Sequence, residues 1–159
     1  MSTILVMDED QGVRLLYAEE FSEEGYDVIT CGDAARLMEL ISSKKPDIVL
    51  MEALFSNHDG LDLLQDISNV FQGLPVILCT AHPAFREDLR SLAAYAFMVK
   101  GSNLKPLKAL IEKVIEESGQ PCSSKPLVKG GGLDSTATEP FRERNSGDAS
   151  FFHSEQVEV

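Results

Sequence analysis

Four short apolar runs, each ending on a polar or charged residue, constrain the fold of this 159-residue chain most strongly. The runs are ILVM before Asp8, IVLM before Glu52, VILC before Thr80 and FMV before Lys100. Short runs rich in Ile, Val and Leu, separated by segments of helical period, are typical of parallel strands that crossover helices bury on both faces. With a further strand expected around residues 27–31, the pattern predicts an α/β domain of about five strand–helix units.

The polar residues at the strand ends are the candidate functional residues. Right-handed crossovers bring the carboxyl ends of parallel strands to one edge of the sheet, where open α/β sheets bind their ligands. We therefore expect the carboxylates of Asp8, Glu9 and Glu52, the hydroxyl of Thr80 and the ammonium of Lys100 to share one pocket. This set of groups suits a hard divalent cation and a phosphoryl group.

Segments of helical period lie between the runs. Their apolar stripes are Val13, Leu16, Tyr17 and Phe21; Leu37, Met38 and Ile41; Leu63, Leu64, Ile67, Val70 and Phe71; and Leu104, Leu107, Ile111, Val114 and Ile115. Each stripe is expected to cover the sheet. Asp33 is the expected cap of the second helix, and Asp10 is interpreted as a solvated residue or a cap for the first helix rather than a metal ligand.

The chain is predicted to form one domain with a tail. Residues 1–118 carry every periodic segment, whereas residues 119–159 are rich in Gly, Ser, Thr and Glu without a sustained period. We interpret the second part as a flexible, disordered extension. Its Gly130–Gly132 run is interpreted as a linker rather than a phosphate loop, and Phe151–Phe152 as a stray aromatic pair rather than a docking motif.

Charge and composition exclude several classes of function. The net charge is −12, of which −10 lies in residues 1–120, so direct nucleic-acid binding is not expected. The apolar runs are far too short to span a bilayer, and no basic region precedes a hydrophobic stretch at the N-terminus. An odd number of cysteines, three, fits a reducing cytoplasm, which is the expected location.

Several motifs occur together in the order and spacing of a known family. ILVMDED, DIVLME followed by HDGLDLL, VILCTA and FMVK resemble the receiver domain of bacterial two-component response regulators, the CheY-like family. The resemblance covers about residues 2–118. It implies a flavodoxin-like (βα)5 fold, a doubly wound parallel sheet with strand order 2-1-3-4-5.

The resemblance also implies a role for each strand-end residue. The implied metal positions are Asp8, Glu9 and Glu52, with the main-chain carbonyl of Leu54 as a further ligand of Mg²⁺. Glu52 stands at the position of the Asp that accepts a phosphoryl group from a histidine kinase. Thr80 and Lys100 match the residues that contact the phosphoryl group, and Phe97 matches the switch aromatic.

The sequence departs from the family at two carboxylates. Glu52 replaces the acceptor Asp and Glu9 the second Asp of the metal pair. The extra methylene moves a carboxylate by roughly 1.3 to 1.5 Å, and a misplacement of about 1 Å costs on the order of 10²-fold in rate. We therefore expect little or no phosphorylation and weak Mg²⁺ binding, with Glu52 a partial imitation of a phosphoryl group. A pseudo-receiver is the preferred interpretation, and a working receiver is the first alternative.

A second alternative is an enzyme. The strand-end motifs also resemble the haloacid-dehalogenase phosphatases, with Asp8 as nucleophile, but the chain lacks their final acidic motif and their cap domain. No enzymatic activity is therefore expected. Because no output domain follows, we expect signalling through protein contacts on the surface of residues 83–117, with a histidine kinase or a second copy of the chain as partner.

Overall fold

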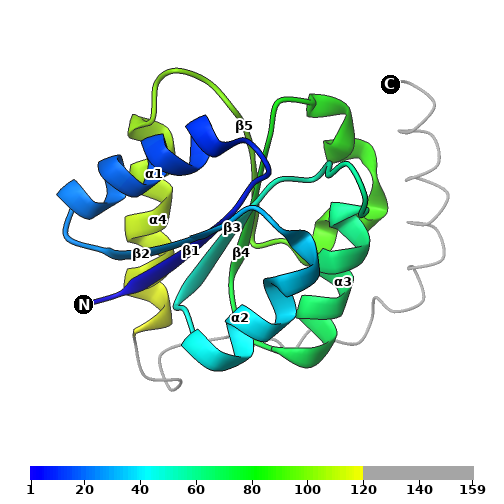
Figure 1. The fold of residues 1–159 in the computed structure, drawn as a ribbon, viewed down its shortest axis with the longest axis horizontal. Helices are drawn as coiled ribbons and strands as arrows, with labels where there is room; N and C mark the ends of the chain where they lie inside the picture. Colours follow the sequence, from blue (N-terminus) through cyan, green and yellow to red (C-terminus); the bar gives the residue numbers. More distant parts are fainter. Residues whose placement is uncertain (120–159) are drawn as a thin grey trace, which may run out of the picture. The chain divides into compact units, whose positions relative to one another are not determined.

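A computed structural model of the protein describes residues 1–119, which form a five-stranded parallel sheet flanked by helices (Figure 1). The strands are β1 (Thr3–Met7), β2 (Asp27–Cys31), β3 (Ile48–Met51), β4 (Val76–Thr80) and β5 (Ala96–Val99). The α-helices are α1 (Gln11–Glu23), α2 (Leu37–Lys44), α3 (Gly60–Val70) and α4 (Lys105–Ser118). The strand order is β2-β1-β3-β4-β5, which confirms the predicted fold.

The central strands are buried as the apolar runs predict. Every residue of β3 and β4 is buried, because these strands lie inside the sheet and helices cover both faces. The edge strands β2 and β5 are more exposed. Val6 pairs with Leu50, and Met51 pairs with both Met7 and Leu78, so β1, β3 and β4 end side by side.

Helices cover the two faces of the sheet as separate layers. In Figure 1, α1 and α4 lie on one side of the strands and α2 and α3 on the other. Two hydrophobic clusters correspond to these layers: one contains Phe21 of α1 and Ile111 of α4, and the other contains Leu37 of α2 and Leu64 of α3. The hydrophobic core therefore has two parts, one on each face of the sheet.

Local capping fixes where the helices begin. Asp10 accepts hydrogen bonds from the amides of Gly12 (2.7 Å) and Val13 (3.2 Å) at the start of α1, so its capping role is confirmed. Asp33 caps the short 3₁₀ helix η1 (Ala34–Arg36), which precedes α2, rather than α2 itself.

The apolar stripes are narrower than predicted. Leu16 lies about 100° around α1 from the buried Tyr17, and it is exposed. Val70 is exposed because it is the last residue of α3, beyond the buried turns of that helix. The prediction that both residues cover the sheet was wrong.

The α-helix that a (βα)5 fold places between β4 and β5 is absent from the described residues. Two 3₁₀ helices, η2 (Pro83–Glu87) and η3 (Leu89–Ala93), stand in its place. Between them Asp88 has an extended backbone (ψ 127°), and its side chain caps η3 through the amide of Arg90. An internal residue that competes for backbone hydrogen bonds in this way prevents one continuous helix.

Arg90 of η3 forms ion pairs that connect this segment to α3. Its guanidinium forms ion pairs with Asp62 (2.7 Å), Asp88 (2.8 Å) and Asp59 (3.1 Å). Asp59 is also the cap of α3, where it accepts from the amides of Leu61 and Asp62. The 3₁₀ segment therefore has a defined position without a helical backbone.

Two predicted features, the Gly130–Gly132 linker and the Phe151–Phe152 pair, lie outside the described residues.

Within residues 1–119, no helix is both long and apolar enough to cross a membrane.

Candidate functional site

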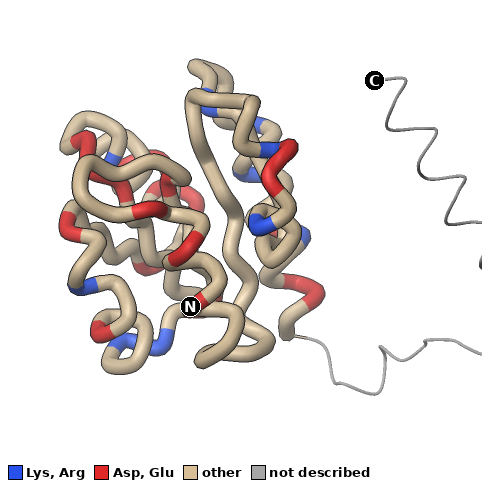
Figure 2. Tube along the Cα trace, turned by 90° about the vertical axis from the view of Figure 1, so that its right-hand side faces the viewer, with Lys and Arg blue, Asp and Glu red and all other residues tan. Residues whose placement is uncertain are grey.

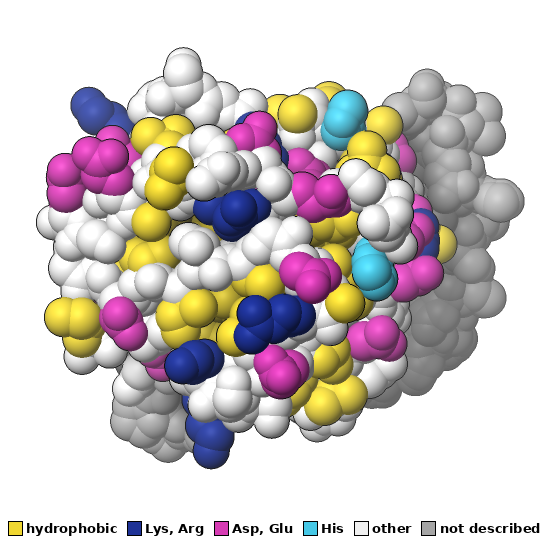
Figure 3. Space-filling view, in the orientation of Figure 1, with side chains coloured by type: hydrophobic (Ala, Val, Ile, Leu, Met, Phe, Trp, Pro, Cys, Tyr) yellow, Lys and Arg dark blue, Asp and Glu magenta, His cyan; other side chains and the backbone are white. Residues whose placement is uncertain are grey.

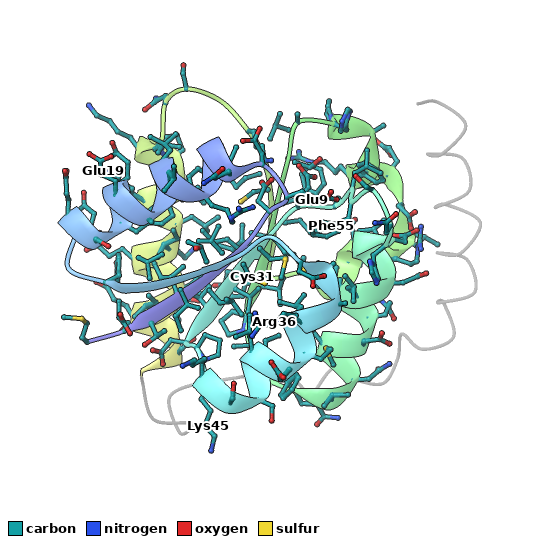
Figure 4. All side chains as sticks on the ribbon, viewed as in Figure 1. Glu9, Glu19, Cys31, Arg36, Lys45 and Phe55 are labelled. Atoms are coloured by element: carbon teal, nitrogen blue, oxygen red, sulfur yellow. The ribbon has the colours of Figure 1, made fainter. Side chains whose placement is uncertain are left out.

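The strand-end residues gather as predicted at one edge of the sheet. An open cavity of about 480 Å³ lies there. It is lined by Asp8, Glu9, Asp10, Glu52, Leu54, Phe55, Ser56 and Lys100. Figure 4 labels Glu9 and Phe55, which lie close together beside the ends of the central strands. The cavity therefore combines acidic groups from two neighbouring strands with one ammonium.

Lys100 joins the two buried carboxylates of the cavity. Its Nζ lies 2.6 Å from Oδ2 of Asp8 and 2.8 Å from Oε2 of Glu52. Lys100 follows β5 and is held at the sheet edge by a hydrogen bond from its amide to the carbonyl of Thr80 (2.8 Å). Burial alone lowers the pKa of Lys100, but its hydrogen bonds to Asp8 and Glu52 outweigh burial and raise it. The ammonium therefore remains charged.

Glu52 is satisfied on both carboxylate oxygens. Oε1 accepts hydrogen bonds from the amides of Ala53 (2.6 Å) and Leu54 (3.2 Å), and Oε2 faces Lys100. Burial raises the pKa of Glu52, but hydrogen bonds from Lys100 and Thr80 bring it below its ordinary value. The side chain is therefore held as a carboxylate by donors from three strand ends.

Asp8 and its loop are held by main-chain contacts. Oδ1 of Asp8 accepts from the amide of Asp10 (2.9 Å). Arg14 of α1 donates to the carbonyls of Asp8 (2.6 Å) and Glu9 (3.0 Å). The segment that carries both acids is therefore tied to the first helix.

Glu9 contacts Ser56 in the loop between β3 and α3. One carboxylate oxygen accepts from the Ser56 hydroxyl (2.8 Å), and the other accepts from the Ser56 amide. Sequence reasoning did not identify Ser56, because nothing in its local pattern marks a residue that pairs with an acid 47 positions earlier.

The carboxylates do not fit a metal ion in this arrangement. Mg²⁺ requires several oxygen ligands around one point. Here Asp8 and Glu52 share Lys100, and Glu9 is engaged by Ser56. Across residues 1–119, no group of three Asp, Glu, His or Cys side chains is arranged to hold a metal. Leu54, the predicted carbonyl ligand, lies on the cavity wall and donates its amide to Glu52.

The two predicted switch residues occupy different environments. Thr80 is fully buried, its side chain hydrogen-bonds Glu52, and its hydroxyl oxygen accepts from the amide of His82 (3.2 Å). Phe97 in β5 is half-buried and packs against the cluster on the α2–α3 side of the sheet. The guanidinium of Arg86 from η2 lies 4.9 Å from the centre of its ring. Phe97 is therefore the point at which β5 meets the 3₁₀ segment.

Known proteins match the part of the chain that carries this site. Residues 4–112 match the family model of the response regulator receiver domain. The DNA-binding transcriptional regulator NtrC of a Bradyrhizobium strain is 30% identical over 124 residues. The match covers 77% of this chain but 26% of that protein, so the chain spans only a fraction of such relatives.

Two solved structures share the fold. The response regulator TrrA of Thermotoga maritima, in complex with Mg²⁺ and beryllofluoride, is 32% identical with a TM-score of 0.70. The match covers 72% of this chain and 99% of that one. A complex of the histidine kinase ThkA with TrrA gives 31% identity and a TM-score of 0.68, covering 72% of this chain and 98% of that one.

Proposed function

Because the chain belongs to the response regulator receiver family, we propose that it is a pseudo-receiver, a two-component signalling domain that works without a phosphoryl group on Glu52. Receiver domains are signalling domains, which argues against the phosphatase alternative with Asp8 as nucleophile.

The state of Glu52 is the observation that carries this proposal. In-line phosphoryl transfer needs a carboxylate oxygen free to attack and correctly placed. Both oxygens of Glu52 already accept hydrogen bonds or face an ammonium, and the side chain is one methylene longer than Asp. Attack by Glu52 would require it to leave Lys100 and the loop amides.

The same contacts support a permanent signalling bias. In this proposal the carboxylate of Glu52 takes part of the place of a phosphoryl group and holds Thr80 and Lys100 toward it. One negative charge imitates a phosphoryl group only in part, because that group carries about two. A contact that is always present shifts the conformational equilibrium once and leaves little for phosphorylation to add.

A protein partner is proposed for the surface of residues 83–117. Leu89 and Leu92 of η3 are 79% and 78% exposed, and Tyr95 and Val99 are also exposed nearby in sequence. Exposed apolar side chains that gather on one segment are typical of protein-binding surfaces. A histidine kinase, the partner of TrrA in its complex, and a second copy of this chain are the two candidates.

The charged side chains argue against nucleic acid as the partner. In Figure 2 the Lys and Arg positions along the trace are interspersed with Asp and Glu positions, and on the face drawn in Figure 3 basic side chains lie scattered among acidic ones without a continuous stripe. Phosphate backbones are bound by clustered Lys and Arg, so we do not propose a nucleic-acid partner.

For Mg²⁺ we propose weak binding only, since Lys100 and Ser56 already engage the carboxylates.

Incubation with acetyl phosphate and Mg²⁺, followed by intact mass measurement, tests the proposal. We expect no stable phosphoryl adduct on the wild type, because Glu52 is both displaced and engaged. Glu52→Asp shortens the side chain and is expected to gain an adduct of one phosphoryl group. Glu52→Gln, which keeps the length and removes the nucleophile, is the matched control. Stoichiometric labelling of the wild type that Glu52→Gln abolishes would identify a working receiver instead.

A further inference from the structure

The contact between Glu9 and Ser56 joins two loops that are distant in sequence. Glu9 lies between β1 and α1, and Ser56 lies between β3 and α3. The Ser56 amide and hydroxyl bind different oxygens of the same carboxylate. Hydrogen bonds to an ionised acceptor are about twice as strong as neutral ones, so this pair is a substantial tie between the loops.

Both loops are anchored next to this contact. Arg14 donates a hydrogen bond to the carbonyl of Glu9 (3.0 Å). The β3–α3 loop is closed at its base by a hydrogen bond from the Gly60 amide to the Ala53 carbonyl (3.1 Å) and by a bridge between Leu54 and Asp59. Ser56 lies between these two anchors, so Glu9 holds the middle of the loop.

The loop forms a wall between two cavities. Leu54, Phe55 and Ser56 line the acidic cavity, and the same residues line a second cavity of about 320 Å³. The second cavity extends to His58 in the loop and to Phe85 in η2. A change in the position of the loop would therefore change the shape of both cavities, the one beside η2 and the one at the strand ends.

We infer that Glu9 is an internal latch for the β3–α3 loop, and that this latch and a divalent cation are alternative uses of one carboxylate. A cation at the acidic cavity competes with the Ser56 amide and hydroxyl for the oxygens of Glu9. The latch keeps the loop in place without metal. This inference is independent of the acceptor chemistry, because the hydrogen bonds of the latch involve neither Glu52 nor Lys100.

The first test of the latch is amide hydrogen exchange at Ser56, measured by NMR without any phosphodonor. Glu9→Ala removes the acceptor and is expected to speed exchange of this amide by about tenfold. Ser68→Ala, an exposed position on α3, is the control and is expected to leave it unchanged. Equal exchange rates in Glu9→Ala and the wild type would overturn the latch.

The second test is titration with Mg²⁺, followed by the same amide resonances. Ser56→Ala removes one of the two donors to Glu9, so it is expected to bind Mg²⁺ about three- to tenfold more tightly than the wild type. Ser68→Ala is expected to match the wild type. Equal or weaker binding by Ser56→Ala, or binding detectable in neither protein, would overturn the competition between loop and cation.

Discussion

Replacing Lys100 by methionine is expected to lower the free energy of unfolding by about 2–4 kcal/mol. Lys100 is the ammonium between two carboxylates that are almost fully buried, Asp8 at 5% and Glu52 at 8% exposed. Methionine fills a similar volume without charge, so the two carboxylates would face each other without a cation. The lower part of the range allows for the 19% exposure of the Lys100 side chain.

Chemical denaturation measures this effect, with two comparison variants. Lys105→Met removes an exposed lysine at the start of α4 and is expected to change stability by less than about 0.5 kcal/mol. The double variant Glu52→Gln with Lys100→Met removes one of the stranded charges, so it should recover part of the loss. A Lys100→Met protein as stable as Lys105→Met would contradict the account of the ion pairs.

Replacing Gly60 by alanine is expected to destabilise the fold by about 3 kcal/mol or more. A Cβ at this position would lie 2.5 Å from the carbonyl oxygen of Ala53 and 2.6 Å from that of Glu52. Both atoms belong to the main chain that follows β3, so neither can rotate away. Relief of the clash would have to move α3 or the backbone that presents Glu52.

Gly101 offers a matched control for this substitution. A Cβ there meets no atom within 4 Å, so Gly101→Ala is expected to leave stability within about 0.5 kcal/mol of the wild type. Thermal and denaturant unfolding of the two variants provide the comparison. Similar stabilities for Gly60→Ala and Gly101→Ala would show that the close approach of α3 to Glu52 is not required.

The positions of Asp8, Glu52, Thr80 and Lys100 followed from the sequence because they depend on topology alone. Once the apolar runs are parallel strands, their carboxyl ends must share an edge. The contacts of Lys100 with Asp8 and Glu52 then need only a long side chain at the last of these ends. Periodicity and chain order were sufficient for this part of the site.

The 3₁₀ segment could not be predicted in the same way. The (βα)5 fold that the resemblance implies places a helix between β4 and β5, whereas the observed backbone depends on the cap at Asp88 and on the ion pairs of Arg90 with α3. The contact of Ser56 with Glu9 has a similar origin, since it depends on the conformation of a loop. Contacts between loops carry no period, so they become visible only when the chain is folded.

The measurement that tests the central claim most directly is the response of the amide NMR spectrum to beryllofluoride with Mg²⁺, the combination bound to TrrA. The claim is that Glu52, held by Lys100 and Thr80, has already set the state of the domain. The predicted result is that, compared with Mg²⁺ alone, beryllofluoride leaves the resonances of Thr80 and Phe97 unchanged in the wild type and shifts them in Glu52→Asp. Shifts in the wild type that match those of Glu52→Asp, spreading through β4, η2 and η3 to β5, would contradict it.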